Sequence, residues 1–228
     1  MSWINKLEML ILPNDIIIGL TEVYKHQGRQ LYHDEVVKGD IKTIIDQTIE
    51  KDIFYFNQLL DLKVPDSRLR ALSRKDINPR NNAEKTILNF KDVVHNIFDN
   101  YKTFEYSTNE VQAIHSHLFK NIANTRFATT ETKTKFSSQR TKNKRLELDD
   151  LFEKSYEMYK KNDYEKLLLT ILIFIDFYNI KGFKENNEYT SLVLLHLLLF
   201  KSGFDNFKYV SFYEYITENF DEYRTALI

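Results

Sequence analysis

Hydrophobic residues recur along most of the chain at intervals of three and four, the spacing of helices that bury one face. This spacing predicts a helix over residues 14–26 and a longer one over 40–62. Two later runs, 167–180 and 189–200, are apolar on nearly every side and predict two buried core helices. The first of these, from about 164 to 179, is expected at the centre of the molecule and almost fully buried.

Turn and capping residues predict where other helices begin. Pro65 introduces a short helix and Pro79 a longer one, because proline suits the start of a helix and disrupts its interior. Ser107 and Glu110 have the spacing of a capping box, in which each side chain bonds the other's backbone N–H. A last helix is expected after Ser211. These signals add up to an all-α fold.

The helical spacing stops between residues 124 and 145 and resumes near Leu148. Thr is frequent in this segment and favours strands, so an extended structure is expected. Seven basic residues accompany a single acidic one, and Phe127 and Phe136 lie among them. Such a segment can contact nucleic acid, but a solvated loop or a protein-binding segment accounts for it better.

The composition supports a compact helical protein of one or two domains. The 228 residues are 43% hydrophobic, and with only five Gly and three Pro they lack the turn residues that an all-β fold needs. The absence of Cys excludes disulfides, thiolate metal sites and Cys nucleophiles. Both apolar runs are shorter than the roughly 20 residues of a membrane-spanning helix. We therefore expect no membrane association and a cytoplasmic protein.

The histidines give little indication of a metal site. His115 and His117 are two residues apart, which places them on different faces of a helix, so they are not a chelating pair. His196 lies in the second apolar run and is expected to be a hydrogen-bonded core histidine.

The polar loop between the two apolar runs provides a resemblance to a known family. Phe177-Tyr-Asn-Ile-Lys-Gly-Phe183, followed by Lys-Glu-Asn-Asn187, resembles the Fic (Fido) family loop His-Pro-Phe-x-Asp/Glu-Gly-Asn-Gly-Arg. The residues around Ile114–Phe119 and Arg126-Phe127 are similar to the family's preceding helix and its β-hairpin flap. The resemblance covers roughly residues 80–215.

This resemblance implies a Fic-like helical bundle with a short β-hairpin flap at about 125–141, close to the loop. It divides the chain into an N-terminal helical extension, residues 1–78, packed on a Fic-like domain, residues 79–228, as one compact unit. Flap residues expected to contact a partner are Arg126, Phe127, Lys133, Lys135, Phe136 and Arg140.

Three positions of the loop match the family motif: Phe183, Glu185 and Asn187. The resemblance implies that Phe183 anchors the loop and that Glu185 occupies the position linked to Mg²⁺. The metal would be held only if the loop still binds a nucleotide.

The other motif positions are replaced. Lys181 stands for the catalytic His and Gly182 for the Pro, while Asn186 and Glu188 stand for glycines of the phosphate-binding nest. Tyr189 stands for the phosphate-binding Arg, whose charge and bidentate geometry it lacks. Lysine is a poor general base because its ordinary pKa is near 10.4.

The resulting interpretation is a Fic-fold protein that is catalytically impaired, needs no cofactor, and binds a protein partner through the flap and the 181–189 loop. One alternative is an active protein adenylyltransferase that moves AMP from Mg-ATP, or a related nucleotidyl or phosphoryl group. A weaker alternative is nucleic-acid binding through residues 124–145.

Overall fold

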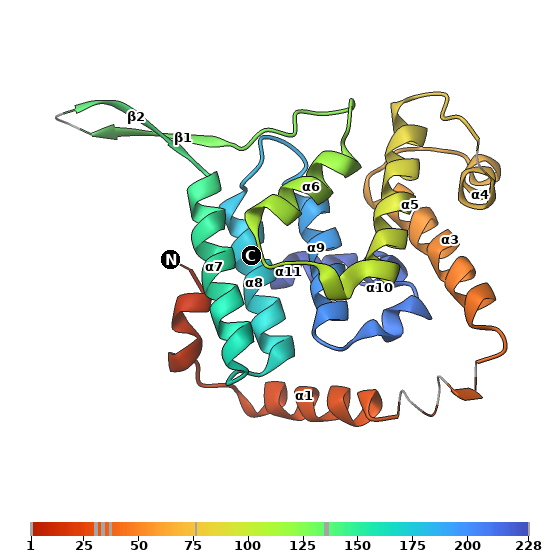
Figure 1. The fold of residues 1–228 in the computed structure, drawn as a ribbon, viewed down its shortest axis with the longest axis horizontal. Coiled ribbons are helices and arrows are strands. Elements are labelled where there is room, and N and C mark those ends of the chain that lie inside the picture. The colour runs from red at the N-terminus through yellow and green to blue at the C-terminus, as the bar shows by residue number, and fades with distance from the viewer. Residues whose placement is uncertain are drawn as a thin grey trace.

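The computed structural model describes residues 2–29, 32, 35–36, 38–75, 77–134 and 137–227, with backbone only at Glu8 and over 131–142. Its elements in chain order are η1 (Ile4–Met9), α1 (Asn14–Gln27), α3 (Ile41–Leu59), α4 (Asp66–Arg74), α5 (Asn82–Asn100), η2 (Tyr101–Thr103), α6 (Thr108–Leu118), β1 (Thr129–Thr134), β2 (Ser137–Asn143), α7 (Arg145–Lys161), α8 (Lys166–Ile180), α9 (Asn187–Lys201), η3 (Asp205–Lys208), α10 (Phe212–Glu218) and α11 (Phe220–Ala226) (Figure 1). The all-α prediction with one short hairpin is confirmed.

Helix α9 forms the centre of the core. Its side chains from Thr190 to Leu194 and from His196 to Phe200 are buried, and it contacts α6, α8, η2 and η3. Helix α8 lies between α7 and α9 and is less covered than expected, because Ile171 on its outer face is 39% exposed. The prediction that residues 164–179 are nearly fully buried is therefore wrong, and the helix after the loop takes that place.

Among the described helices, none has the length and apolar composition needed to cross a bilayer.

The first residues of the chain are bound to the middle of α8 by a buried carboxylate. Asp176 accepts hydrogen bonds from the hydroxyl of Ser2 (2.6 Å) and the backbone N–H groups of Trp3 (2.7 Å) and Ile4 (2.8 Å). These contacts satisfy N–H groups at the start of η1 that have no partner within the helix. The side chains of Ile4 and Leu7 in this helix enter the core. The sequence did not predict this 3-10 helix.

Capping side chains set several helix starts as predicted. The Ser107 hydroxyl accepts from the N–H of Glu110 (3.3 Å), although the reciprocal half of the capping box is absent from the described contacts. Helix α5 begins later than Pro79, because the Asn81 side chain accepts from the N–H of Glu84 (2.9 Å) and is the actual cap. The last predicted helix is two helices, α10 and α11, which separate at Asn219.

A single hydrophobic cluster includes residues from both ends of the chain, such as Ile4, Ile53, Leu197 and Ile216. The N-terminal helices therefore share a core with the later ones, while the division at residue 78 stays a prediction.

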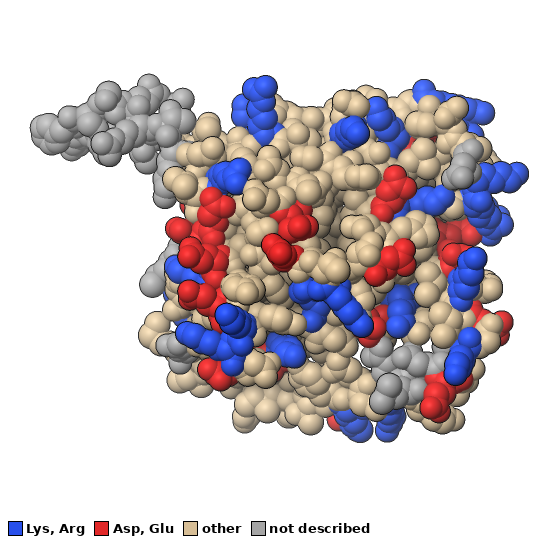
Figure 2. All heavy atoms as spheres, in the orientation of Figure 1, with Lys and Arg blue, Asp and Glu red and all other residues tan. Residues whose placement is uncertain are grey.

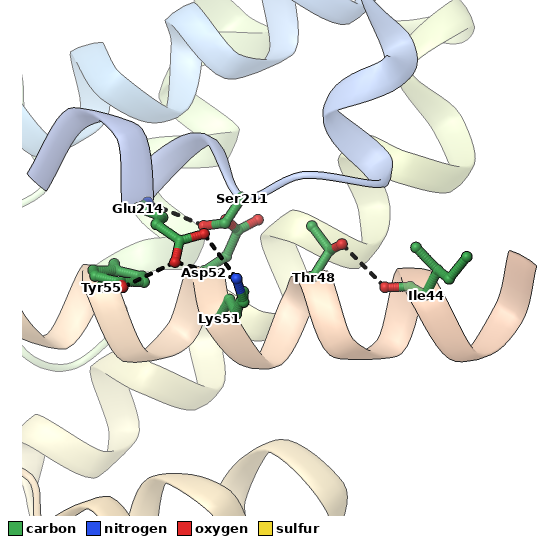
Figure 3. Close-up of polar contacts among 7 residues, drawn as sticks. All are labelled: Ile44, Thr48, Lys51, Asp52, Tyr55, Ser211 and Glu214. Carbon is green, nitrogen blue, oxygen red and sulfur yellow. Dashed lines mark hydrogen bonds and ion pairs between the residues drawn. The ribbon is translucent and has the colours of Figure 1, made fainter. Parts of the chain in front are cut away.

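A buried carboxylate joins α3 to α10 within this core (Figure 3). Asp52 is fully buried, and the hydroxyl of Ser211, which also caps α10, donates to its Oδ1 at 2.5 Å. Its Oδ2 has no hydrogen-bond partner among the described residues. Burial therefore raises the pKa of Asp52 to about 8, despite the opposing effect of the Ser211 hydrogen bond.

His196 is buried as predicted, but without the expected hydrogen bonds. Its ring stacks on Phe212 with centroids 4.9 Å apart, and neither ring nitrogen has a partner among the described residues. Burial lowers the pKa of His196 to about 3, so the ring is neutral and behaves as an aromatic core residue.

We predict that Asp52→Asn stabilises the protein increasingly as the pH rises. The pKa of Asp52 is higher in the folded than in the unfolded chain, so ionisation costs stability progressively from about pH 4 to about pH 8. Asn keeps a hydrogen bond to Ser211 but cannot ionise. Denaturant unfolding should show a gain of at least about 2 kcal/mol at pH 8 and much less at pH 5. Asp46→Asn, at an exposed position of the same helix, is the control; an equal gain at both pH values for Asp52→Asn would contradict the prediction.

Candidate functional site

The loop between α8 and α9 is anchored by Phe183, whose side chain is 1% exposed. Its ring stacks on His115 of α6 with centroids 3.9 Å apart and planes 6° apart. On another side Phe127 stacks on it at 5.3 Å. Burial of a ring of this size is worth about 1.5–3 kcal/mol, so Phe183 fixes the loop against the body, as the motif implies.

Asn187 holds the loop closed. Its Oδ1 accepts from the backbone N–H of Phe183 (2.9 Å), and its Nδ2 donates to the carbonyl of Phe183 (2.7 Å). Both ends of the amide are thus bonded to one residue within the loop. The side chain at the motif's Asn position is structural here.

The hairpin begins directly beside the loop, as predicted for the flap. The N–H of Ala128 donates to the carbonyl of Gly182 (2.8 Å), the N–H of Lys184 donates to the carbonyl of Arg126 (3.0 Å), and Phe127 forms an antiparallel bridge with Phe183. Strands β1 and β2 then pair antiparallel, and Figure 1 shows the hairpin extending away from the helices. The loop backbone at 182–184 is therefore already paired with the chain's own flap base.

Two residues of the loop adopt left-handed backbone conformations. Lys181 has φ 51° and ψ 57° at the end of α8, and Asn186 has φ 57° and ψ 29° before α9. Asn tolerates this region, whereas a lysine there costs roughly 1 kcal/mol relative to glycine. Asn186 therefore accommodates the left-handed turn before α9, and Lys181 is held in a strained conformation.

The charged residues of the loop face solvent. Glu185, at the motif's Mg²⁺-linked position, accepts from the backbone N–H of Asn124 (3.2 Å). Lys181 is exposed, and the described part of the chain gives neither it nor Lys184 a carboxylate within 4.0 Å.

The first turn of α9 bears a carboxylate and a phenol where the motif has glycine and arginine. Glu188 lies with Oε1 3.5 Å from the hydroxyl of Tyr178, at the limit of hydrogen-bonding distance. Tyr189 is half-buried, and burial followed by the charge of Glu188 raises the pKa of its phenol. This helix end therefore presents a carboxylate and a phenol.

His115 is a site residue that sequence reasoning did not single out. It is fully buried beneath Phe183, its Nδ1 lies 2.7 Å from the Thr190 hydroxyl, and its Nε2 has no partner among the described residues. Burial lowers the pKa of His115 to about 4, so it is neutral. The Nε2 of His117 lies 3.7 Å from Oδ2 of Asp92, away from Phe183. Within the described residues no group of three potential ligands could hold a metal ion.

The predicted flap residues are only partly visible. Arg126 is exposed, and Phe127 is half-buried with the guanidinium of Arg145 5.4 Å from its ring centroid. Lys133 and Arg140 lie in the paired strands, with only their backbone described. Lys135 and Phe136 lie outside the described residues.

Figure 2 shows Lys and Arg atoms interspersed with acidic ones on the described part of one face of the molecule. Most side chains of the basic segment 124–145 lie outside what the structure describes, so nucleic-acid binding through this segment stays a prediction.

The helical order, the loop between α8 and α9 that Phe183 anchors, and the adjoining hairpin are those of a Fic-like fold, and a solved structure agrees. The crystal structure of a Fic family protein from Desulfovibrio desulfuricans G20 is similar with a TM-score of 0.67 and 13% sequence identity. The match covers 96% of this chain and 67% of that chain. No protein-family model matches the sequence, and no curated protein does either. At this identity the likeness establishes the fold alone.

We predict that Gly182→Ala destabilises the protein by about 1–3 kcal/mol through overpacking. A Cβ at residue 182 would lie 2.5 Å from Cδ1 of Leu148, and because Leu148 is fully buried, its side chain would have to shift within the packed core. Denaturant unfolding measures the loss, and Leu148→Val in the same chain should recover part of it. Gly19→Ala is the control, because nothing lies within 4 Å of its added Cβ. An unchanged midpoint for Gly182→Ala would contradict the tight contact.

Proposed function

We propose that this Fic-fold protein no longer performs group transfer and acts by binding a protein partner through the hairpin and the adjacent 181–189 loop. The observation that carries the proposal is the carboxylate of Glu188 in the first turn of α9. A helix N-terminus attracts phosphate through its free N–H groups and positive partial charge. Here the turn supplies its own anion, and no Lys or Arg occurs between residues 185 and 200.

The contacts of the two other polar motif residues support the same view. Asn187 bonds both backbone groups of Phe183, and Glu185 accepts from Asn124 at the start of the flap. A residue already bonded within the protein must give up that contact to hold a ligand. The loop therefore retains the interactions that maintain its shape and lacks those that would stabilise a transferring phosphoryl group.

The hairpin supports a role in protein binding. β1 and β2 form a two-stranded sheet, so each strand has one edge with no neighbour in that sheet. Such an edge can pair with an extended segment of another chain, with backbone hydrogen bonds giving affinity. The backbone bridge between Phe127 and Phe183 holds the hairpin base at the loop, which makes the two elements one continuous surface.

We predict that 4 mM Mg-ATP, or any other Mg-NTP, raises the melting temperature by less than about 2 °C. A ligand at 100 times its Kd would add about 2.7 kcal/mol, or roughly 5–10 °C for a chain of this size. Differential scanning fluorimetry with magnesium alone as the control measures the shift. A rise of 5 °C or more that Glu185→Gln abolishes would favour the adenylyltransferase alternative instead.

We predict that shortening the hairpin abolishes partner binding while the fold survives. Residues 131–141 are replaced by Asn-Gly, which forms a two-residue turn between Thr130 and Lys142, a pair already in register. Phe127 and Lys144, which tie the hairpin base to the loop and to α7, are kept.

Cross-linked proteins from source cells are quantified by mass spectrometry for the parent and shortened chains. The amount of partner recovered with the shortened chain should fall at least about tenfold, and its melting temperature should stay within about 2 °C of the parent's. Equal recovery with both chains would show that the hairpin does not bind it. Glu153→Gln, at an exposed position of α7, is the matched control on a different surface.

A further inference from the structure

A cavity of about 350 Å³ lies where the start of α9 and the end of α8 meet the C-terminal helix α11. This volume is within the range of small-ligand sites. Its polar and aromatic walls are formed by Tyr178, Glu188, Tyr189, Phe220, Tyr223 and Arg224.

Four aromatic residues line this cavity, alongside Leu59, Leu192 and Leu227. The rings of Phe220 and Tyr223 are stacked, with centroids 6.2 Å apart and planes 26° apart. Tyr178 and Tyr189 line the cavity from α8 and α9. The faces of aromatic rings carry partial negative charge and attract ammonium and guanidinium groups.

Glu188 adds a carboxylate to the wall of this cavity, with its Oε1 3.5 Å from the hydroxyl of Tyr178. Burial is the first cause, and nearby charges that include Glu188 in each case further raise the pKa of Tyr178, Tyr189 and Tyr223. All three tyrosines line the cavity together with Glu188. Apart from the long contact to Tyr178, the described residues offer it no hydrogen bond from a side chain and no cation within 4.0 Å.

Arg224 contributes a cation at the wall but does not neutralise the carboxylate. Its guanidinium lies over Phe220, 5.9 Å from the ring centroid, and its side chain is exposed. Glu188 affects all three phenols, whereas the opposing charge of Arg224 acts on Tyr178 alone. Arg224 lies more than 4.0 Å from the Glu188 carboxylate and leaves it without an ion pair among the described residues, while its own guanidinium already lies over the Phe220 ring of this wall.

We infer that this cavity binds a small organic cation, an alkylammonium or guanidinium group, which stacks on its aromatic walls and pairs with Glu188. The group is either a free small molecule or the side chain of a lysine or arginine on another protein. This inference goes beyond the proposed function, because it assigns a separate ligand chemistry whether or not the flap binds a partner.

The test uses tetramethylammonium and ethylguanidinium chlorides as probes, titrated into the full chain at constant ionic strength and followed by NMR of the backbone amides of 188–192 and 220–227. We expect a Kd of about 1–10 mM for at least one probe, as suits a few cation–π contacts and one ion pair. Tert-butanol, a neutral molecule of similar shape to tetramethylammonium, should bind at least about tenfold more weakly. No localised shift up to 100 mM of either probe would overturn the inference.

Two charge-removing variants determine the sign of the ligand's charge. Glu188→Gln should weaken probe binding at least about fivefold, and Arg224→Gln should tighten it about two- to fivefold by removing a like charge. Tyr223→Phe, which keeps the ring, should change the Kd less than about twofold, and melting temperatures verify that all variants fold. If Glu188→Gln tightens binding and Arg224→Gln weakens it, the cavity is an anion site. If both variants weaken binding, it is a zwitterion site. Either result overturns the inference.

A last comparison separates the two sources of the cation. N-acetyl-arginine methylamide presents the same guanidinium on a peptide backbone. If it binds at least as tightly as ethylguanidinium, the cavity receives a protein side chain; if only ethylguanidinium binds, the ligand is a free small molecule. Because these titrations contain no nucleotide or partner protein, their outcome is independent of the melting and hairpin experiments.

Discussion

The buried ring of Phe183 is the contact on which the loop, the flap and the start of α9 all depend. It fills the space between His115 and Phe127, and its own backbone groups are held by Asn187 and by the bridge to the flap. One residue thereby positions three elements. Because that anchoring uses the ring and the backbone, the outward-facing side chains at 181, 185 and 188 can change without loss of the loop's shape.

The helices could be predicted from local information. Helical spacing located α3 and α9, and the caps at Ser107 and Ser211 lie where the sequence indicated. Prediction failed where a distant residue decides the structure. η1 is capped by a carboxylate more than 170 positions later, and the exposure of α8 depends on what covers its outer face. No local pattern contains that information.

The same limit applies to the candidate site. The motif resemblance identified Phe183 and Asn187, and the structure places both at the centre of the loop's contacts. It gave no signal for His115 as the surface on which Phe183 stacks, or for Leu148 as the neighbour of Gly182, because both contacts arise from packing between helices. The sequence also did not predict that α11 forms a wall of the cavity beside Glu188, because it indicated a single last helix.

The carboxylate of Asp176 also determines the order in which the chain can complete its fold. The donors on Ser2, Trp3 and Ile4 are synthesised 172 to 174 residues before their acceptor. At about 5–20 residues per second, η1 waits roughly 9 to 35 seconds for this partner. Ile4 and Leu7 cannot reach their final places in the core beside α8 until that helix has been made. The docking of η1 is therefore set by the synthesis of α8 and not by that of its own residues.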